Sequence, residues 1–176
     1  MARRFRGSEE VRIDGKGRMS IPAKFRRVFE AADPDWKTGE RPRLVIVYGR
    51  PDWTWIELYT IEAIEEIDAQ IDLMQRGSPE RRLLESIMHG AAEEAEIDTD
   101  GRLVLPQKLR EKIGLDDSAF FIAAGDYLKL WKPETYAAEG QEVEDYVATL
   151  EPGFDPRALL PPLPRPDASR REGPGT

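Results

Sequence analysis

The chain has 176 residues, of which 40% are hydrophobic and 34% charged, and its formal net charge at pH 7 is −8. It has no cysteine and one histidine, which excludes disulfides, thiol nucleophiles and a metal centre built from several histidines of one chain. No apolar run reaches the roughly 18 residues that a membrane-spanning helix needs, so we expect a cytoplasmic protein.

The charge is unevenly distributed along the chain. Residues 1–30 carry nine Lys or Arg against four Asp or Glu, whereas residues 61–100 carry three against twelve. A basic segment can attract nucleic acid even when the whole protein is negatively charged. The net charge therefore does not exclude a nucleic-acid partner.

An internal repeat covers much of the sequence. Residues 11–26 (VRIDGKGRMSIPAKFR) align without a gap with residues 95–110 (AEIDTDGRLVLPQKLR). Seven positions are identical, and the apolar positions between them match. We conclude that the chain contains a duplicated unit.

Each repeat begins with a predicted β-hairpin. Residues 11–13 alternate between apolar and polar, as in a half-buried strand. Asp14 then begins a turn by accepting backbone N–H groups, and Gly15 and Gly17 are expected to supply positive φ. The alternation resumes at residues 19–21, which predicts the second strand of the hairpin.

A short helix and two further strands are expected after each hairpin. Pro22 and Pro106 suit the first position of a helix, where the missing N–H costs nothing. The helices are predicted at 23–29 and 106–113, and the strands at 44–48, 54–59, 119–123 and 127–131. A unit of this size is too small for a core of its own, so we expect two units, or two chains, to complete each other's sheets.

The rest of the chain is predicted to be helical and then proline-rich. Isoleucines recur at helical spacing from Ile61 to Ile71, and Gly77 followed by Ser78 and Pro79 indicates a helix end and a new start. One more amphipathic helix is expected at 136–150. Seven of the fourteen prolines lie after Leu150, which favours an extended or disordered tail.

The repeated pattern Asp-x-x-Gly-Arg followed by Pro resembles the signature of the AbrB-like domain, a swapped-hairpin β-barrel found in bacterial regulators and antitoxins. Two copies, together with Phe5-Arg6-Gly7 and Arg81-Arg82-Leu83-Leu84, resemble the MraZ family over about residues 5–150. The resemblance implies a DNA-binding transcriptional regulator associated with the nucleoid. It also implies rings of many subunits that bind short direct repeats upstream of their own division and cell-wall operon.

The expected fold is therefore α+β, with two AbrB-like swapped-hairpin barrel units joined by helices. We expect no cofactor and no small-molecule substrate. The predicted segments are a first, DNA-binding unit at 8–61, a helical connection at 62–91, a second unit at 92–135, a C-terminal helix at 136–150 and a flexible tail at 151–176.

Basic residues around the first turn are the candidate DNA-binding site. Arginine can pair bidentately with guanine in the major groove, which admits a two-stranded ribbon. Arg18 is the first candidate, and in the resembled family the arginine of this motif is tied to operator binding. The other candidates are Lys16, Arg12, Arg6 and Arg102, and Arg3 and Arg4 lie nearby in sequence. A separate set of residues is expected to shape the turns: Asp14, Gly17, Pro22, Asp98, Gly101 and Pro106.

Two interpretations of the motif stay open at this point. Asp14 and Arg18 could contact DNA, or they could simply pair across the turn. In the second repeat, Glu96 replaces Arg12 and Asp100 replaces Lys16, which weakens attraction to phosphate. We therefore expect the first unit to contact DNA and the second mainly to build the assembly.

Other classes of function fit the sequence less well. Paired Asp14 and Asp98 suggest an aspartic-type catalytic dyad, but the residues that usually surround such a dyad are missing and the chain leaves little room for a cleft. An antitoxin-like protein-binding module of the same fold is the main alternative. Two units and a helical centre disfavour it, whereas the proline-rich tail is compatible with it.

Overall fold

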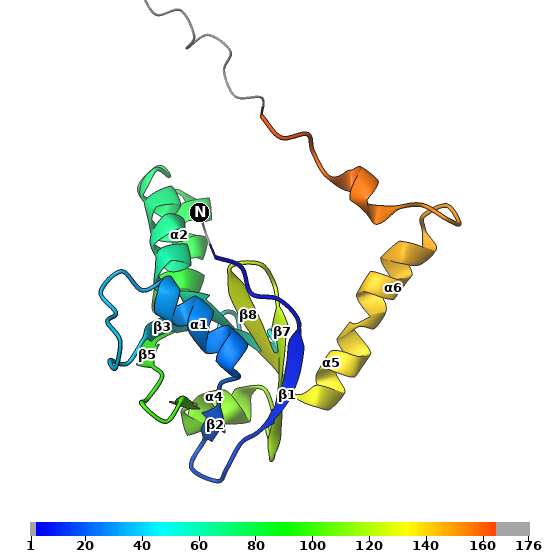
Figure 1. Cartoon of the computed structure of the whole chain (residues 1–176). Helices are drawn as coiled ribbons and strands as arrows, with labels where there is room; N and C mark the ends of the chain where they lie inside the picture. Colours follow the sequence, from blue (N-terminus) through cyan, green and yellow to red (C-terminus); the bar gives the residue numbers. More distant parts are fainter. Residues whose placement is uncertain (1–2, 165–176) are drawn as a thin grey trace, which may run out of the picture. The chain divides into compact units, whose positions relative to one another are not determined.

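The computed structural model describes residues 3–164 (Figure 1). The chain divides into two compact units, one up to Glu139 and one from Gly140 onward. Both repeats thus belong to one unit. No helix in the described range is both long and apolar enough to cross a membrane.

The compact unit up to Glu139 combines antiparallel strands with helices, as expected for an α+β fold. Its first half contains β1 (Ser8–Arg12), β2 (Arg18–Ser20), α1 (Ala23–Ala31), β3 (Arg43–Val47) and β4 (Trp55–Thr60). The connection contains α2 (Ile61–Asp72), α3 (Pro79–Glu85) and the π-helical turn η1 (Ser86–Gly90). Its second half contains β5 (Ala92–Glu96), β6 (Arg102–Val104), α4 (Gln107–Lys112), β7 (Ser118–Ala123), β8 (Tyr127–Trp131) and α5 (Pro133–Glu139).

The main sheet exchanges strands between the repeats. Its six strands have the order β1-β7-β8-β4-β3-β5, and all pairs are antiparallel. The first strand of each repeat pairs with the third strand of the other, so that β1 pairs with β7 at one edge and β5 with β3 at the other (Figure 1). The expectation that the two repeats complete each other's sheets is confirmed.

The second sheet is a ribbon of two strands, β2 and β6, which also come from different repeats. Its register places Arg18 opposite Val104, Met19 opposite Leu103 and Ser20 opposite Arg102. The prediction that β1 and β2 form a local hairpin is wrong beyond the turn, since Ile13 and Met19 make only an isolated bridge. Met19 and Leu103 are each 1% exposed, so burying this central pair favours pairing between the repeats.

Two reciprocal hydrogen bonds lock each turn against the other repeat. The N–H of Leu105 donates to the carbonyl of Gly17 at 2.8 Å, and the N–H of Ile21 donates to the carbonyl of Gly101 at 2.9 Å. These four residues occupy equivalent positions in the two repeats. The ribbon is thus extended at both ends by contacts that neither repeat can make alone.

An arginine from the helix of each repeat closes over the turn of the other. Arg110 donates from Nη1 to the carbonyl of Gly15 at 3.2 Å, and its guanidinium leaves no space for a side chain at Gly17. Arg26 lies in the same way over Gly101. The repeats therefore interlock through side chains as well as backbone.

One glycine of each turn has the left-handed conformation. Gly17 has φ 82° and Gly101 has φ 78°. Gly15 does not have positive φ, so the expectation for this residue is wrong. The second repeat has Thr99 at the equivalent position, in keeping with a site that tolerates a side chain.

The core is shared between the repeats. Apolar side chains on one face of the six-stranded sheet meet the buried faces of α1, α4 and the ribbon, with the largest contributions from Phe25, Phe29, Phe121, Leu103 and Leu105. A second cluster joins α2 to the opposite face through Val45, Val47, Ile64 and Ile71. The alternation along β3, with Leu44 and Ile46 on one side, accounts for its contacts with both layers.

The helix boundaries follow local signals closely. Pro22 and Pro106 are the N-caps of α1 and α4. The first of these helices begins at Ala23, as predicted, and the second begins at Gln107, one residue later than predicted. Gly77 has φ 77°, and the Ser78 hydroxyl accepts the N–H of Arg81 at 3.2 Å to begin α3. The helix expected at 136–150 is divided at Gly140, which separates α5 from α6 (Gln141–Ala148), consistent with the low helix propensity of glycine.

The compact unit that begins at Gly140 is small. It contains α6 and the 3₁₀ turn η2 (Pro156–Leu159). The part of the predicted tail at 165–176 lies outside the described residues.

We expect Gly17→Ala to lower the free energy of unfolding by about 1–3 kcal/mol, because alanine at positive φ is strained. A Cβ there would also collide with the carbonyl oxygen of Leu105. Urea unfolding at a fixed protein concentration measures the change. Gly15→Ala is the matched control, because a Cβ at Gly15 meets no other atom within 4 Å; equal losses in the two variants would contradict the interlock.

Candidate nucleic-acid interface

Asp14 organises the first turn. Its Oδ1 accepts the backbone N–H groups of Lys16 and Arg18, both at 3.0 Å, and its Oδ2 accepts Nε–H of Arg18 at 2.7 Å. The hydrogen bonds from the Arg18 backbone and side chain hold the pKa of Asp14 below its usual value. The carboxylate therefore fixes both the backbone of the turn and the direction of the Arg18 side chain.

The second turn has the same backbone but a different side-chain arrangement. Asp98 Oδ1 accepts the N–H groups of Asp100 and Arg102, both at 2.9 Å. Within residues 3–164 the Arg102 guanidinium makes no bond to Asp98, whereas that of Arg18 bonds to Asp14. The pairing interpretation thus holds for the first repeat only, and there it uses only the Nε of the arginine.

Three of the candidate arginines surround one hollow. Arg12 at the end of β1, Arg18 on β2 and Arg102 on β6 line a cavity of about 300 Å³. The same hollow is bordered by Asp14, Ile13, Ser20 and Asp117. The pairing of β2 with β6 therefore brings basic side chains from both repeats to one surface.

The outer face of the ribbon is open to solvent. Arg18, Ser20, Arg102 and Val104 are exposed, while Met19 and Leu103 between them face the core. We call these four exposed residues the ribbon face. Successive side chains of a strand point to opposite sides, so the burial of the central pair directs both arginines outward.

Several positive charges near the first turn have no acidic partner in the described part of the chain. Lys16 lies exposed at the tip of the turn. Among residues 3–164, neither Lys16 nor Arg12 nor Arg102 makes an ion pair with a carboxylate. These groups are available to an external anion.

The arginines at the start of the chain lie elsewhere. Arg6 precedes β1, whose five residues separate it from the first turn, a span of about 16 Å for an extended strand. Arg4 forms an ion pair with Asp126 at 3.7 Å, close to the turn between β7 and β8. The structure does not bring Arg6, Arg4 or Arg3 into the group around Arg18.

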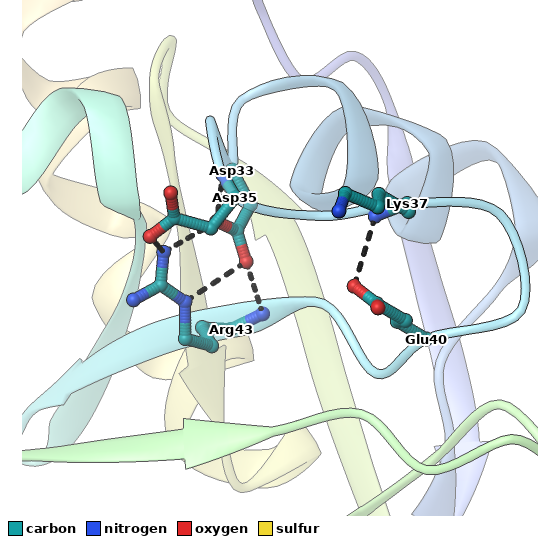
Figure 2. Close-up of polar contacts among 5 residues, drawn as sticks. All are labelled: Asp33, Asp35, Lys37, Glu40 and Arg43. Carbon is teal, nitrogen blue, oxygen red and sulfur yellow. Dashed lines mark hydrogen bonds and ion pairs between the residues drawn. The ribbon is translucent and has the colours of Figure 1, made fainter.

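The loop between α1 and β3 of the first repeat is held by polar contacts among its own residues (Figure 2). Arg43 holds this loop, since its Nη2 lies 2.6 Å from Asp33 Oδ1 and 2.8 Å from Asp35 Oδ2. The hydrogen bond from Arg43 keeps the pKa of the buried Asp33 carboxyl low. Loop residues Trp36 and Glu40 line a hollow of about 370 Å³ together with the second turn, and the carbonyl of Pro42 accepts the N–H of Ile97 at 3.0 Å.

This loop has no counterpart of similar length in the second repeat. Eleven residues separate α1 from β3, but only five separate α4 from β7. The second turn therefore differs from the first in two ways: the long loop before β3 lies beside it, and it carries Asp100 at its tip.

The sequence interpretation missed the positioning role of Arg26 and Arg110. The sequence pattern assigns no role to either residue, yet both close over the opposite turns. The sequence did contain one signal for this role, because Arg26 and Arg110 are identical at equivalent positions of the two repeats. A residue that only covers the surface need not recur in this way.

The aspartates of the motif are engaged in backbone hydrogen bonds of their own turns. Asp14 and Asp98 each accept two N–H groups of their own turn. Within the described part of the chain, no three acidic or histidine side chains are grouped closely enough to hold a metal ion.

Comparisons with known proteins identify the family. Residues 4–74 and 88–149 match the family model described as "MraZ protein, putative antitoxin-like". A protein of Ruegeria pomeroyi named Transcriptional regulator MraZ is 52% identical over 161 residues, which cover 91% of this chain and 96% of that protein. Proteins of the same name from Cereibacter sphaeroides and Parvibaculum lavamentivorans are 42% identical over 167 residues (91% and 97% covered) and 37% identical over 156 residues (89% of each). The chain therefore belongs to the MraZ family of transcriptional regulators, which are not enzymes.

Proposed function

We propose that this protein regulates transcription by binding short direct repeats in promoter DNA, in the control region of its own division and cell-wall operon. The observation that carries the proposal is the group of Arg12, Arg18 and Arg102 around one exposed hollow beside the ribbon face. The DNA-binding surface consists of the first turn and this ribbon. The protein acts in the cytoplasm, on the nucleoid.

The geometry of Arg18 suits recognition of a guanine. Asp14 holds Nε at 2.7 Å, and within residues 3–164 the two terminal nitrogens donate to no other group. These nitrogens form the fork that pairs with O6 and N7 of guanine in the major groove. The aspartate thus prepares the arginine for DNA instead of competing with DNA for it.

Lys16 and Arg12 suit contacts with the phosphate backbone. Their positive charges flank the ribbon and are not paired with carboxylates of the described residues. Phosphate contacts set the register of a protein on the duplex and make binding salt-dependent. A locally basic surface can do this on a protein whose net charge is −8.

We infer further that the two repeats are AbrB-like units of the swapped-hairpin type. The pairing of β1 with β7, β5 with β3 and β2 with β6 supports this inference. The proposed organisation is a first unit at 8–61, a connection at 62–91, a second unit at 92–135, a helical segment at 136–150 and a tail beyond it.

The two repeats contribute unequally to the DNA surface. The first supplies Arg18, Lys16 and Arg12, and the second supplies Arg102 through β6. Asp100 and the neighbouring 33–42 loop disfavour phosphate at the second turn. The second repeat therefore serves mainly to complete the fold and the assembly.

The active form is a homo-oligomer, in which several ribbons face tandem sites. A single three-residue ribbon offers too few contacts for a specific operator. Linked copies raise the effective concentration of each ribbon at the next repeat.

An antitoxin-like protein-binding module is the second candidate. The description of the matched family favours it, and so does the apolar surface on α6, where Val143, Tyr146 and Val147 are 65%, 55% and 47% exposed. Co-purification of a small toxin would support this function, whereas a homo-oligomer without one supports the regulator.

Arg18→Ala is expected to weaken binding to the DNA upstream of its own gene by about tenfold or more, because a bidentate guanine contact is lost. Gel shifts at two salt concentrations measure the loss and the salt dependence together. Arg82→Ala is the control, since Arg82 is an exposed arginine on α3. Binding that survives Arg18→Ala would move the site away from the first turn.

Asp100→Lys is expected to increase affinity for the same DNA severalfold at low salt, because it places a lysine where the first turn has Lys16. The gain should shrink as salt is raised, since counterions screen the added charge. An unchanged affinity at low salt would show that charge at the second turn does not limit binding.

Light scattering on the intact protein at micromolar concentration is expected to report several subunits per particle. A monomer under these conditions would refute the proposed assembly, while leaving DNA binding to be judged from the gel shifts.

A further inference from the structure

An apolar side chain lies on the otherwise polar ribbon face. Val104 is 52% exposed and stands directly opposite Arg18 in the register of β2 and β6. Side chains opposite each other on one face of an antiparallel pair have Cβ atoms about 5 Å apart. Val104 and Arg18 therefore present adjacent apolar and cationic groups to whatever covers the ribbon.

The position of Val104 also distinguishes the two repeats. Arg18 and Arg102 are equivalent, but the residue equivalent to Val104 in the first repeat is Ser20. The ribbon face thus contains an Arg18–Val104 pair at one end and an Arg102–Ser20 pair at the other. The apolar group lies at the end next to the first turn, which carries Asp14 and the exposed Lys16.

The major groove offers one apolar group that distinguishes bases, the C5-methyl of thymine. An exposed valine beside an arginine that reads guanine matches a base step in which thymine neighbours that guanine. We propose that Val104 contacts the methyl group of such a thymine and so helps to determine which sequence the ribbon binds. The inference rests on the proposed DNA-binding function and adds a residue of the second repeat to sequence recognition.

Removal of the thymine methyl groups tests this contact directly. The upstream fragment is amplified with dTTP or with dUTP, and the intact oligomer is titrated against both fragments. We expect the unmodified protein to bind the thymine fragment at least about threefold more tightly, as the burial of a methyl-sized group implies. Val104→Ser, which installs the residue of the first repeat, should bind both fragments equally and bind the thymine fragment more weakly than the unmodified protein does.

Leu83→Ser is the matched control, because Leu83 is an apolar residue on α3 with 49% exposure. It should keep the full preference for thymine, which separates loss of the methyl contact from a general effect of removing surface apolar groups. An unmodified protein that binds both fragments equally would overturn the inference while leaving the proposed function intact. A preference that persists in Val104→Ser would also overturn it, and failure to bind either fragment would overturn the proposed function together with it.

Discussion

The exchange of turns between the two repeats is the constraint on which the rest of the structure depends. Each turn is closed internally by an aspartate, but its outer side is held by the other repeat, through Leu105 N–H on the Gly17 carbonyl and Ile21 N–H on the Gly101 carbonyl. Because neither half can bury its own apolar face alone, the sheet, the ribbon and the core form together. The basic surface is a product of this exchange, since Arg18 and Arg102 become neighbours only when β2 pairs with β6.

Local structure was predictable because it is encoded in short spacings. Apolar alternation located most strands, the proline after each turn located α1 and α4, and Gly77 with Ser78 and Pro79 located the start of α3. Strand partners were not predictable in the same way. The residues of β2 show alternation whether they pair with residues 11–13 or with β6, and only the burial of Met19 against Leu103 in a shared core decides between these partners.

The part of the candidate site whose residues are close together in the sequence was predictable. Arg18, Lys16 and Arg12 are close in sequence and flank the same turn, so their proximity could be inferred from the sequence. Arg6 is only six residues before Arg12 in the sequence, but an extended strand carries it away from the turn. The positions of Arg26 and Arg110 over the turns, and the role proposed for Val104, depend on contacts across the repeat boundary. Repeat equivalence hinted at the two arginines, but it could not indicate that they act on each other's turns.

Joining two unequal repeats in one chain has a consequence for the kind of DNA site. Two identical units related by a twofold axis present a symmetric ribbon, which suits a palindromic site. In this chain the axis is only approximate, because Lys16 corresponds to Asp100 and Ser20 to Val104. One end of the ribbon carries Arg18 and Val104 beside the turn with Lys16, and the other carries Arg102 and Ser20 beside the turn with Asp100. A ribbon with two different ends has a direction along the duplex, and a surface with a direction suits sites repeated head to tail, as the proposed direct repeats are.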